Sequence, residues 1–238
     1  MLKKLCLVLS SVAMLTISSH AGASYTEDAQ PHPYIGADIE HRSLRFEDHF
    51  GDNLFERNAN QYNVWAALRF FKYFGLGIGF DSTSHRQRDT VINEGEYYLG
   101  LLLAPGDGIE GHLTQTKISG THVELIGFLP VCPRYSIDLF ATVGMASNHL
   151  KLTDFFVAQD NILLDSPIMR SYDERKTVAR ASLGAQMILY RNLGMRAQAI
   201  FENNAKFDGL KPIQVPDATT NVNLRNSFIY SFGLYLTC

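Results

Sequence analysis

The feature of this sequence that most constrains its fold is a two-residue alternation of apolar side chains with mostly polar or small ones. Successive side chains of a β-strand point to opposite faces, so each alternating segment predicts a strand with two unlike faces. A soluble β-sandwich would alternate in the same way, so the pattern alone leaves two all-β folds open. Eight segments show it, at residues 34–43, 61–71, 74–85, 117–129, 135–150, 177–190, 194–203 and 224–238.

The lengths of the connectors favour one of these folds. Three connectors are short, at residues 72–73, 130–134 and 191–193, and four are long and polar, at about 44–60, 86–116, 151–176 and 204–221. Short and long connectors alternate strictly, which is typical of membrane barrels with short periplasmic turns and long extracellular loops. Each segment also supplies the roughly 9–11 residues that a tilted strand needs to cross a bilayer. We therefore predict an all-β fold: an eight-stranded antiparallel up-and-down transmembrane β-barrel with short periplasmic turns and four long extracellular loops.

The start of the chain has the order of a secretory signal peptide. Lys3 and Lys4 precede a short apolar stretch, and Ala21-Gly22-Ala23 matches an A-x-A cleavage site. We expect residues 1–23 to be removed, residues 24–33 to form a periplasmic lead-in, and residues 34–238 to form the barrel. No later run approaches the roughly 20 apolar residues of a spanning helix. The predicted location is the cell outer membrane of a Gram-negative bacterium.

The faces opposite the apolar ones carry charged residues that would point into the barrel. An eight-stranded barrel is just wide enough for side chains to fill, and buried charges are costly unless paired. Arginine suits fixed bidentate pairing with carboxylates. The sequence thus predicts a largely closed lumen, with a small aqueous or gated pore as the alternative. The predicted lumen charge network comprises Asp38, Glu40, Arg42, Arg69, Asp81, Glu124, Asp138, Arg180, Arg196, Glu202 and Arg225.

Glycines 75, 77 and 79 fall on the same inward face as the network. We expect them to make room for arginines of neighbouring strands.

Two stretches of the chain resemble a known family. Residues 68–81 read LRFFKYFGLGIGFD, an aromatic, turn, aromatic-Gly-apolar pattern, and the last strand carries Ser231, Gly233 and Leu236 before the terminal Cys238. The first stretch looks like the second hairpin of the OmpA/OmpX-like small outer-membrane barrels. The last strand resembles the C-terminal insertion signal of such barrels, which usually ends in an aromatic residue instead of Cys.

Membership of this family implies an eight-stranded barrel that the barrel-assembly machinery inserts into outer-membrane lipid and lipopolysaccharide. Only the barrel domain is expected, without the peptidoglycan-binding domain of longer members. The family includes structural anchors, adhesins and complement-resistance factors, so the resemblance does not fix one activity.

The mature chain would keep two cysteines, Cys132 and Cys238. An even number in an oxidising compartment permits one disulfide. Both should lie at the periplasmic end, but the turn of Cys132 should lie opposite the last strand. The disulfide is left open on these grounds.

Motifs for chemistry are weak. The histidines are scattered without ligand-spaced pairs, so we predict no metal site, no cofactor and no catalytic residues. Ser147 and His149 share a face at the outer end of a strand, which suggests a lipid A-modifying enzyme at the rim, but the sequence offers no matched acid.

The expected function is a non-enzymatic surface structural or interaction protein of the adhesin type. The net charge of −3 gives no basic footprint for nucleic acid. Binding of a host or surface ligand would lie in the long loops, where apolar runs occur at residues 97–103, 155–157 and 162–164. The alternative functions are a small pore or transporter of apolar solutes and, third, the lipid A-modifying enzyme.

Overall fold

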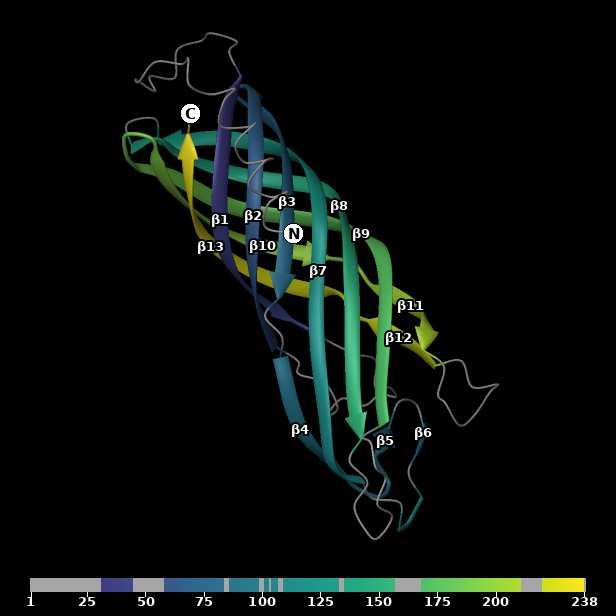
Figure 1. Ribbon diagram of the computed structural model, residues 1–238. Coiled ribbons are helices and arrows are strands. Elements are labelled where there is room, and N and C mark those ends of the chain that lie inside the picture. The colour runs from purple at the N-terminus through teal and green to yellow at the C-terminus, as the bar shows by residue number, and fades with distance from the viewer. Residues whose placement is uncertain are drawn as a thin grey trace, which may run out of the picture.

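In the computed structural model the chain is built from β-strands that close into a ring (Figure 1). The structure describes residues 31–44, 58–83, 86–98, 101–102, 104–106, 109–132, 135–156, 168–210 and 220–237. The predicted signal peptide lies outside the described residues. Eight strands form the ring: β1 (His32–Ser43), β2 (Asn58–Phe71), β3 (Phe74–Thr83), β7 (Ile109–Cys132), β8 (Ile137–Phe156), β9 (Ile168–Tyr190), β10 (Leu193–Glu202) and β13 (Ser227–Thr237).

Each strand of the ring pairs antiparallel with its neighbours. The order is β3-β2-β1-β13-β10-β9-β8-β7, and pairing of β3 with β7 closes the ring. A closed ring leaves no strand edge at that level. The structure confirms the predicted all-β, eight-stranded antiparallel barrel.

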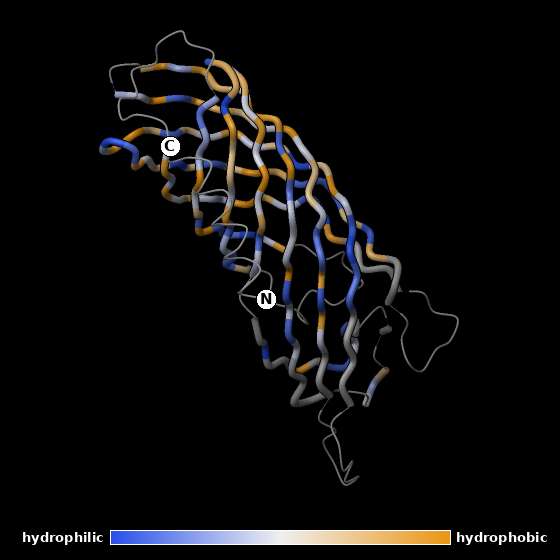
Figure 2. Tube along the Cα trace, turned by 45° about the horizontal axis from the view of Figure 1, so that its top comes forward, coloured by the Kyte–Doolittle hydropathy of each residue, from blue (hydrophilic) through white to orange (hydrophobic). Residues whose placement is uncertain are grey.

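Two sets of side chains separate along every strand of the ring. In β13 every second residue from Ser227 to Tyr235 is buried, and the residues between them are exposed. The exposed set is apolar, as in Ile78 (56 % exposed) and Phe232 (53 %). A continuous apolar outer face of this extent suits acyl chains and would be a liability in water. This apolar belt includes Ile39, Tyr62, Val64, Leu76, Ile78, Phe80, Val123, Leu125, Leu139, Val143, Met145, Leu183, Tyr230, Phe232 and Leu234, and Figure 2 shows the alternation of apolar and polar residues along the ring strands.

The short connectors lie at one end of the ring. Lys72 and Tyr73 join β2 to β3, and Arg191 and Asn192 join β9 to β10. Arg191 has a φ of 47°, the left-handed conformation of a tight turn. The amide of Thr237 donates a hydrogen bond to the carbonyl of Asn192 (2.8 Å), which holds the end of β13 at the same level.

Three ring strands extend far beyond the belt. β7, β8 and β9 have 24, 20 and 23 residues, against the roughly 9–11 that cross a membrane. β4 (Arg86–Ile92) pairs with the outer half of β7, where Arg86 lies opposite Thr116. These segments form a four-stranded projection, which lies at the lower end of Figure 1. We call it the upper sheet; it consists of β4 and residues 109–118, 148–156 and 168–176.

The prediction that residues 86–116 and 151–176 are loops is therefore wrong for much of their length. The alternation continues in the upper sheet, because Thr114, Thr116 and Ile118 are buried while Gln115 and Lys117 are partly exposed. The outward residues there are polar, so the sequence lacks the apolar face by which a membrane strand is found.

Two small ladders complete the described strands. β5 (Tyr97–Tyr98) pairs with β6 (Leu101–Leu102), and β11 (Ala205–Leu210) pairs with β12 (Thr220–Leu224). Residues 157–167, which hold part of the predicted apolar loop runs, lie outside the described residues. The described part of the chain contains no helix that is long and apolar enough to cross a membrane.

Candidate functional site in the barrel lumen

An aromatic layer, the aromatic floor, fills the lumen near the short turns. The Tyr34 ring lies 6.4 Å from that of Phe128 and 5.7 Å from that of Tyr235, and Trp65 lies 6.1 Å from Tyr235. These four residues come from inward positions of four strands, β1, β2, β7 and β13. Their rings therefore meet across the lumen and block it at this level. It comprises Tyr34, Trp65, Ala67, Ile126, Phe128, Phe140 and Tyr235, all less than a tenth exposed.

Arg180 on β9 organises the charges above the floor. Its Nε lies 2.8 Å from Glu124 Oε1 and its Nη1 lies 2.9 Å from Asp81 Oδ2. Nη1 also lies 3.2 Å from Glu202 Oε1, and Nη2 lies 3.6 Å from Glu40 Oε1. The Arg180 side chain is fully buried. One guanidinium is therefore shared by carboxylates from β1, β3, β7 and β10.

Two further arginines flank Arg180. Arg42 donates to Glu202 Oε2, which also accepts a hydrogen bond from Asn148 Nδ2 at 2.8 Å. On the floor side, the Arg196 guanidinium stacks over the Trp65 ring, 4.1 Å from its centroid, with Nε 3.7 Å from Asp38 Oδ2. Cation–π contact with a buried ring adds to the attraction of the carboxylate. Arg196 is thus held between Trp65 and Asp38, and Arg42 is bound to Glu202.

These residues form a central charge cluster with an excess of acid. It holds five carboxylates, from Asp38, Glu40, Asp81, Glu124 and Glu202, and three guanidiniums, from Arg42, Arg180 and Arg196. His122 Nδ1 lies 3.2 Å from Asp81 Oδ2 and is the remaining basic group in contact with the cluster among the described residues. Sharing of Arg180 among four acids follows from this shortage of cations.

A separate pair lies next to the short turns. Arg69 Nη1 lies 2.8 Å from Asp138 Oδ2, and the guanidinium sits 4.3 Å from the centroid of Phe128. Arg69 Nε also donates to the carbonyl of Lys72 at 3.1 Å, which ties this pair to the β2–β3 turn. This pair and the central charge cluster lie on the two sides of the aromatic floor.

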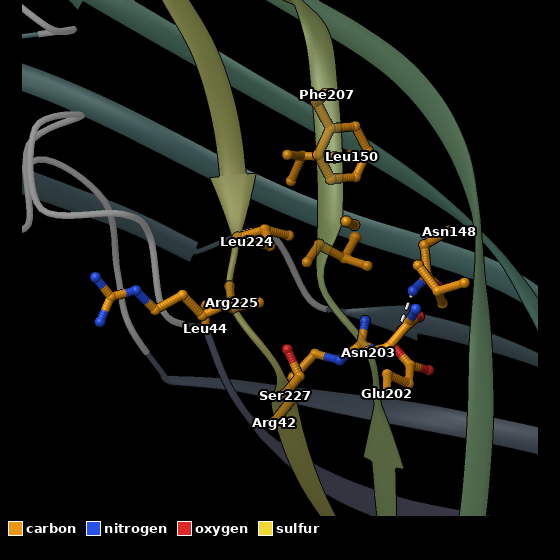
Figure 3. A pocket seen from close by; sticks show the side chains of 13 residues that line it. Arg42, Leu44, Asn148, Leu150, Glu202, Asn203, Phe207, Leu224, Arg225 and Ser227 are labelled. Carbon is orange, nitrogen blue, oxygen red and sulfur yellow. Dashed lines mark hydrogen bonds and ion pairs between the residues drawn. The ribbon is translucent and has the colours of Figure 1, made fainter.

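Apolar side chains cover the central charge cluster on its other side. This apolar cap consists of Leu44, Ile118, Leu150, Leu152, Val178, Ala205, Phe207 and Leu224, all buried. Figure 3 shows Leu150, Phe207 and Leu224 on one side of a small pocket and Arg42, Asn148 and Glu202 on the other. The pocket offers about 10 Å³ to the centre of a water molecule, which is room for about one water. The charged layer is thus enclosed between two apolar layers.

The structure brings ten of the eleven predicted network residues into the lumen, where each is at most 6 % exposed. The exception is Arg225, which is exposed, and its placement in the lumen was wrong. The chain leaves the β-conformation at residues 225–226, between β12 and β13, and the alternation changes phase there. Leu224, just before the interruption, is buried in the apolar cap.

The C-terminal residues take the expected faces as far as they are described. Ser231 and Gly233 point inward and are buried, and Leu236 is 52 % exposed on the belt. Cys238 lies outside the described residues. Cys132 has no disulfide partner among the described residues, and the sheet order puts β7 and β13 on opposite walls of the ring. Because Cys238 is not among the described residues, a disulfide between the two cysteines stays open.

Gly75 and Gly79 make room for rings and Gly77 lies against Ile126, which corrects the expectation that these glycines accommodate arginines. A Cβ at Gly79 would collide with the ring of His122, and one at Gly75 would come within 3.1 Å of the Phe128 ring. At Gly233 a Cβ would collide with the Asp38 side chain and with the carbonyl of Ala37.

We expect Gly233→Ala to lower the free energy of unfolding by about 1–3 kcal/mol, the usual cost of overpacking. The matched control is Gly127→Ala, because the nearest atom to a Cβ at Gly127 is 3.9 Å away. Urea unfolding in detergent micelles measures both. Equal stability of the two variants would contradict the packing described for β1 and β13.

Ser147 and His149 face outward on β8, and the structure supplies an acid that the sequence did not. His149 Nε2 makes a hydrogen bond with Asp173 Oδ1 on β9, which holds the pKa of Asp173 below its ordinary value. Among the described residues His149 is bonded to Asp173, and no hydrogen bond joins it to Ser147. A group of three His, Cys, Asp or Glu side chains able to hold a metal is also absent from the described part of the chain.

Comparison with known proteins places the chain in a family. The family model of the outer membrane protein beta-barrel domain matches residues 8–211. A search of curated proteins finds no match.

Solved structures share the fold at low identity. The outer membrane protein AlkL, solved in lipid bilayers, is 12 % identical, with 93 % of this chain and 97 % of that chain covered and a TM-score of 0.52. Neisserial surface protein A is 11 % identical, with 86 % and 96 % covered and a TM-score of 0.50. Ail of Yersinia pestis, in complex with the heparin analogue sucrose octasulfate, is 11 % identical, with 87 % and 99 % covered and a TM-score of 0.47. The family match over most of the chain, together with the closed ring and the apolar belt, shows that the chain belongs to the outer membrane protein beta-barrel domain family and is a protein of the cell outer membrane.

Proposed function

We propose that this outer-membrane barrel is a non-enzymatic surface protein: its lumen is closed, and its upper sheet carries structural or adhesive contacts outside the membrane. The observation that carries the proposal is the enclosure of the central charge cluster between the aromatic floor and the apolar cap. A barrel without an open path has its working surface outside. The coarser statement, that the chain is an outer-membrane β-barrel protein, holds independently of this proposal.

The charge pairing supports a closed lumen. Arg180 bridges acids on β1, β3, β7 and β10, so an ion path past it would have to break several buried contacts together. Charges removed from water and then separated from their partners are costly by several kcal/mol. A conducting state therefore lies well above the closed one.

The proposed closed lumen predicts silence in a planar bilayer. We expect the purified protein to give no steady single-channel openings at moderate voltage and salt, because the aromatic floor and apolar cap exclude water. Frequent openings of constant size from the wild-type protein would overturn the closed-lumen proposal and favour the pore.

The upper sheet supports a role in surface contact. It begins about where the belt ends, and β7 continues from Thr121 to Ile109, some twelve residues or about 40 Å along the strand. Binding residues concentrate on segments that a rigid scaffold presents to solvent. A partner would meet this sheet before it met the ring.

A shortened variant tests the contact role. Arg86 lies opposite Thr116, so replacing residues 87–115 by an Asn-Gly turn would close the hairpin there and leave the ring intact. We expect bacteria expressing this variant to keep the protein in the outer membrane and to lose attachment to an epithelial monolayer. Unchanged attachment, with the variant present at wild-type level, would contradict the contact role of this part of the upper sheet.

Passage of apolar solutes is the second candidate. The pocket in Figure 3 has apolar walls from Leu44, Phe207 and Leu224, which would suit an apolar molecule. Its size, about one water, is too small for such a solute without movement of the cap. Uptake of a labelled alkane by cells with and without the protein separates this function from the first.

A further inference from the structure

We propose that Lys117, Lys151 and Arg175, the basic patch, form a binding site for the phosphate groups of lipid A on the outer wall of the barrel. The three residues lie side by side on β7, β8 and β9. The proposal uses the outer-membrane placement of the ring and does not depend on whether the lumen is closed.

The height of the basic patch fits a lipid headgroup. β8 begins at Ile137, so a crossing of about 10 residues ends near Ser147. Lys151 lies four residues further, about 13 Å along the strand and roughly 10 Å in height at the usual tilt of such strands. The polar headgroup region extends about 5–8 Å beyond the hydrocarbon core. A long side chain pointing outward at this height reaches the phosphates.

The outward face changes character at this height on all three strands. On β8 the exposed residues Val143 and Met145 are followed outward by Ser147, His149 and Lys151. On β7 the same line runs from the exposed Val123 through Thr121 and Ser119 to Lys117, and on β9 from Leu183 through Ala179 and Thr177 to Arg175. Small polar residues thus separate the belt from the cations on each strand.

Among the described residues no ion pair joins the three cations to a carboxylate, and the one acid beside them is Asp173, whose charge interacts with Lys151 and Arg175. Lys117 lies directly opposite Lys151 across the β7–β8 pair, and like charges in that position are destabilising. Asp173, opposite Lys151, already accepts a hydrogen bond from His149, and Glu174 is paired with Lys176 at 3.0 Å. Three cations beside one carboxylate leave an excess of positive charge on this wall, which a bound anion would neutralise. A phosphate monoester carries about −1.5 to −2 charges and forms strong hydrogen bonds with Lys and Arg.

The direction of the side chains favours a lipid over a soluble ligand. The basic patch faces sideways, away from the barrel axis and above the belt, where lipid A surrounds the protein. The chain as a whole has a net charge of −3, so attraction of phosphates to this wall is a local property of the basic patch.

The test compares three lipids or anions on two variants of equal charge. The first variant is Lys117→Gln/Lys151→Gln/Arg175→Gln; the control is Lys72→Gln/Arg191→Gln/Lys206→Gln, which removes three exposed cations elsewhere. Each mature protein is titrated in detergent micelles with bis-phosphorylated lipid A, with dephosphorylated lipid A and with inorganic phosphate, in the presence of a chelator. The readouts are affinity and the midpoint of thermal unfolding.

We expect bis-phosphorylated lipid A to raise the unfolding midpoint of the wild-type and control proteins by several degrees, and to bind the patch variant at least tenfold more weakly. Dephosphorylated lipid A should have little effect on any of them. Equal affinity for the patch variant and the control, or an equal shift with dephosphorylated lipid A, would overturn the proposal. So would binding of inorganic phosphate at the basic patch without binding of lipid A, which would assign the site to a soluble anion.

Discussion

Replacing Arg180 with Met is expected to lower the free energy of unfolding by about 3–5 kcal/mol, the usual effect of removing one partner from a buried ionic group. Arg180 is fully buried and contacts Glu124, Asp81 and Glu202, with Glu40 slightly further away. Without it, the central charge cluster would hold five carboxylates and two guanidiniums. Urea unfolding of the protein in micelles, or its yield in the outer membrane, measures the loss.

Two variants make this result specific. Arg191→Met removes an exposed arginine at a turn, so it should change stability by no more than about 0.5 kcal/mol. Glu40→Gln removes one of the excess carboxylates and keeps its shape, so it should cost far less than Arg180→Met. If Arg180→Met were as stable as Arg191→Met, Arg180 would not organise the lumen.

Ile78→Arg is expected to destabilise the barrel in bilayers by about 2–4 kcal/mol, the cost of a cation on the lipid face near the membrane midplane. Ile78 lies in the middle of β3 with 56 % of its surface exposed, and its cross-strand partners are Ala66 and Val123. No carboxylate is paired with this position to neutralise the new charge. Folding titrations with denaturant in lipid vesicles give the change in free energy.

The control for this prediction is Gln115→Arg. Gln115 lies on the outward face of β7, as does Val123, the cross-strand partner of Ile78. Unlike Val123 it belongs to the upper sheet, above the belt. Water surrounds it, so the substitution should be nearly neutral. A similar loss for both variants would show that the effect of Ile78→Arg does not come from lipid.

Much of the barrel follows from the two-residue period of the sequence. Successive residues of a strand point to opposite faces, so one residue placed on the correct face fixes the face of every other residue in that strand. Asp38 and Glu40 on β1 are examples. The same phase placed Trp65, Phe140 and Glu124 inward. Ten of the eleven charges predicted for the lumen lie there because their strands run without interruption through the ring.

The errors have physical causes that a period cannot reveal. Arg225 lies at the interruption between β12 and β13. The alternation of β13 does not continue through it, so extending that alternation to Arg225 predicts the wrong face. The upper sheet has no apolar signal in the sequence, because its outward residues, such as Lys117 and Lys151, are polar. The side chain that fills the space beside Gly75 or Gly79 is set by the register between neighbouring strands. The sequence of one strand does not contain that register.

Contacts between distant residues were also beyond the sequence. Asp173 and His149 are far apart in the chain and meet only through the β8–β9 register. The lumen network also has neutral members, such as Gln61 bound to Glu40 and Asn148 bound to Glu202, which a prediction based on charged residues does not include. Their inward phase was the signal that would have found them.

The most direct test of the account is the behaviour of the mature chain without detergent. The belt exposes large apolar side chains all around the ring, from Ile39 on β1 to Leu234 on β13. The account predicts that the purified chain stays monodisperse and rich in β-structure in micelles or bilayers, and aggregates once detergent is removed. A folded monomer that remains in solution in plain buffer would mean that these side chains do not face acyl chains, and it would contradict the account at its base.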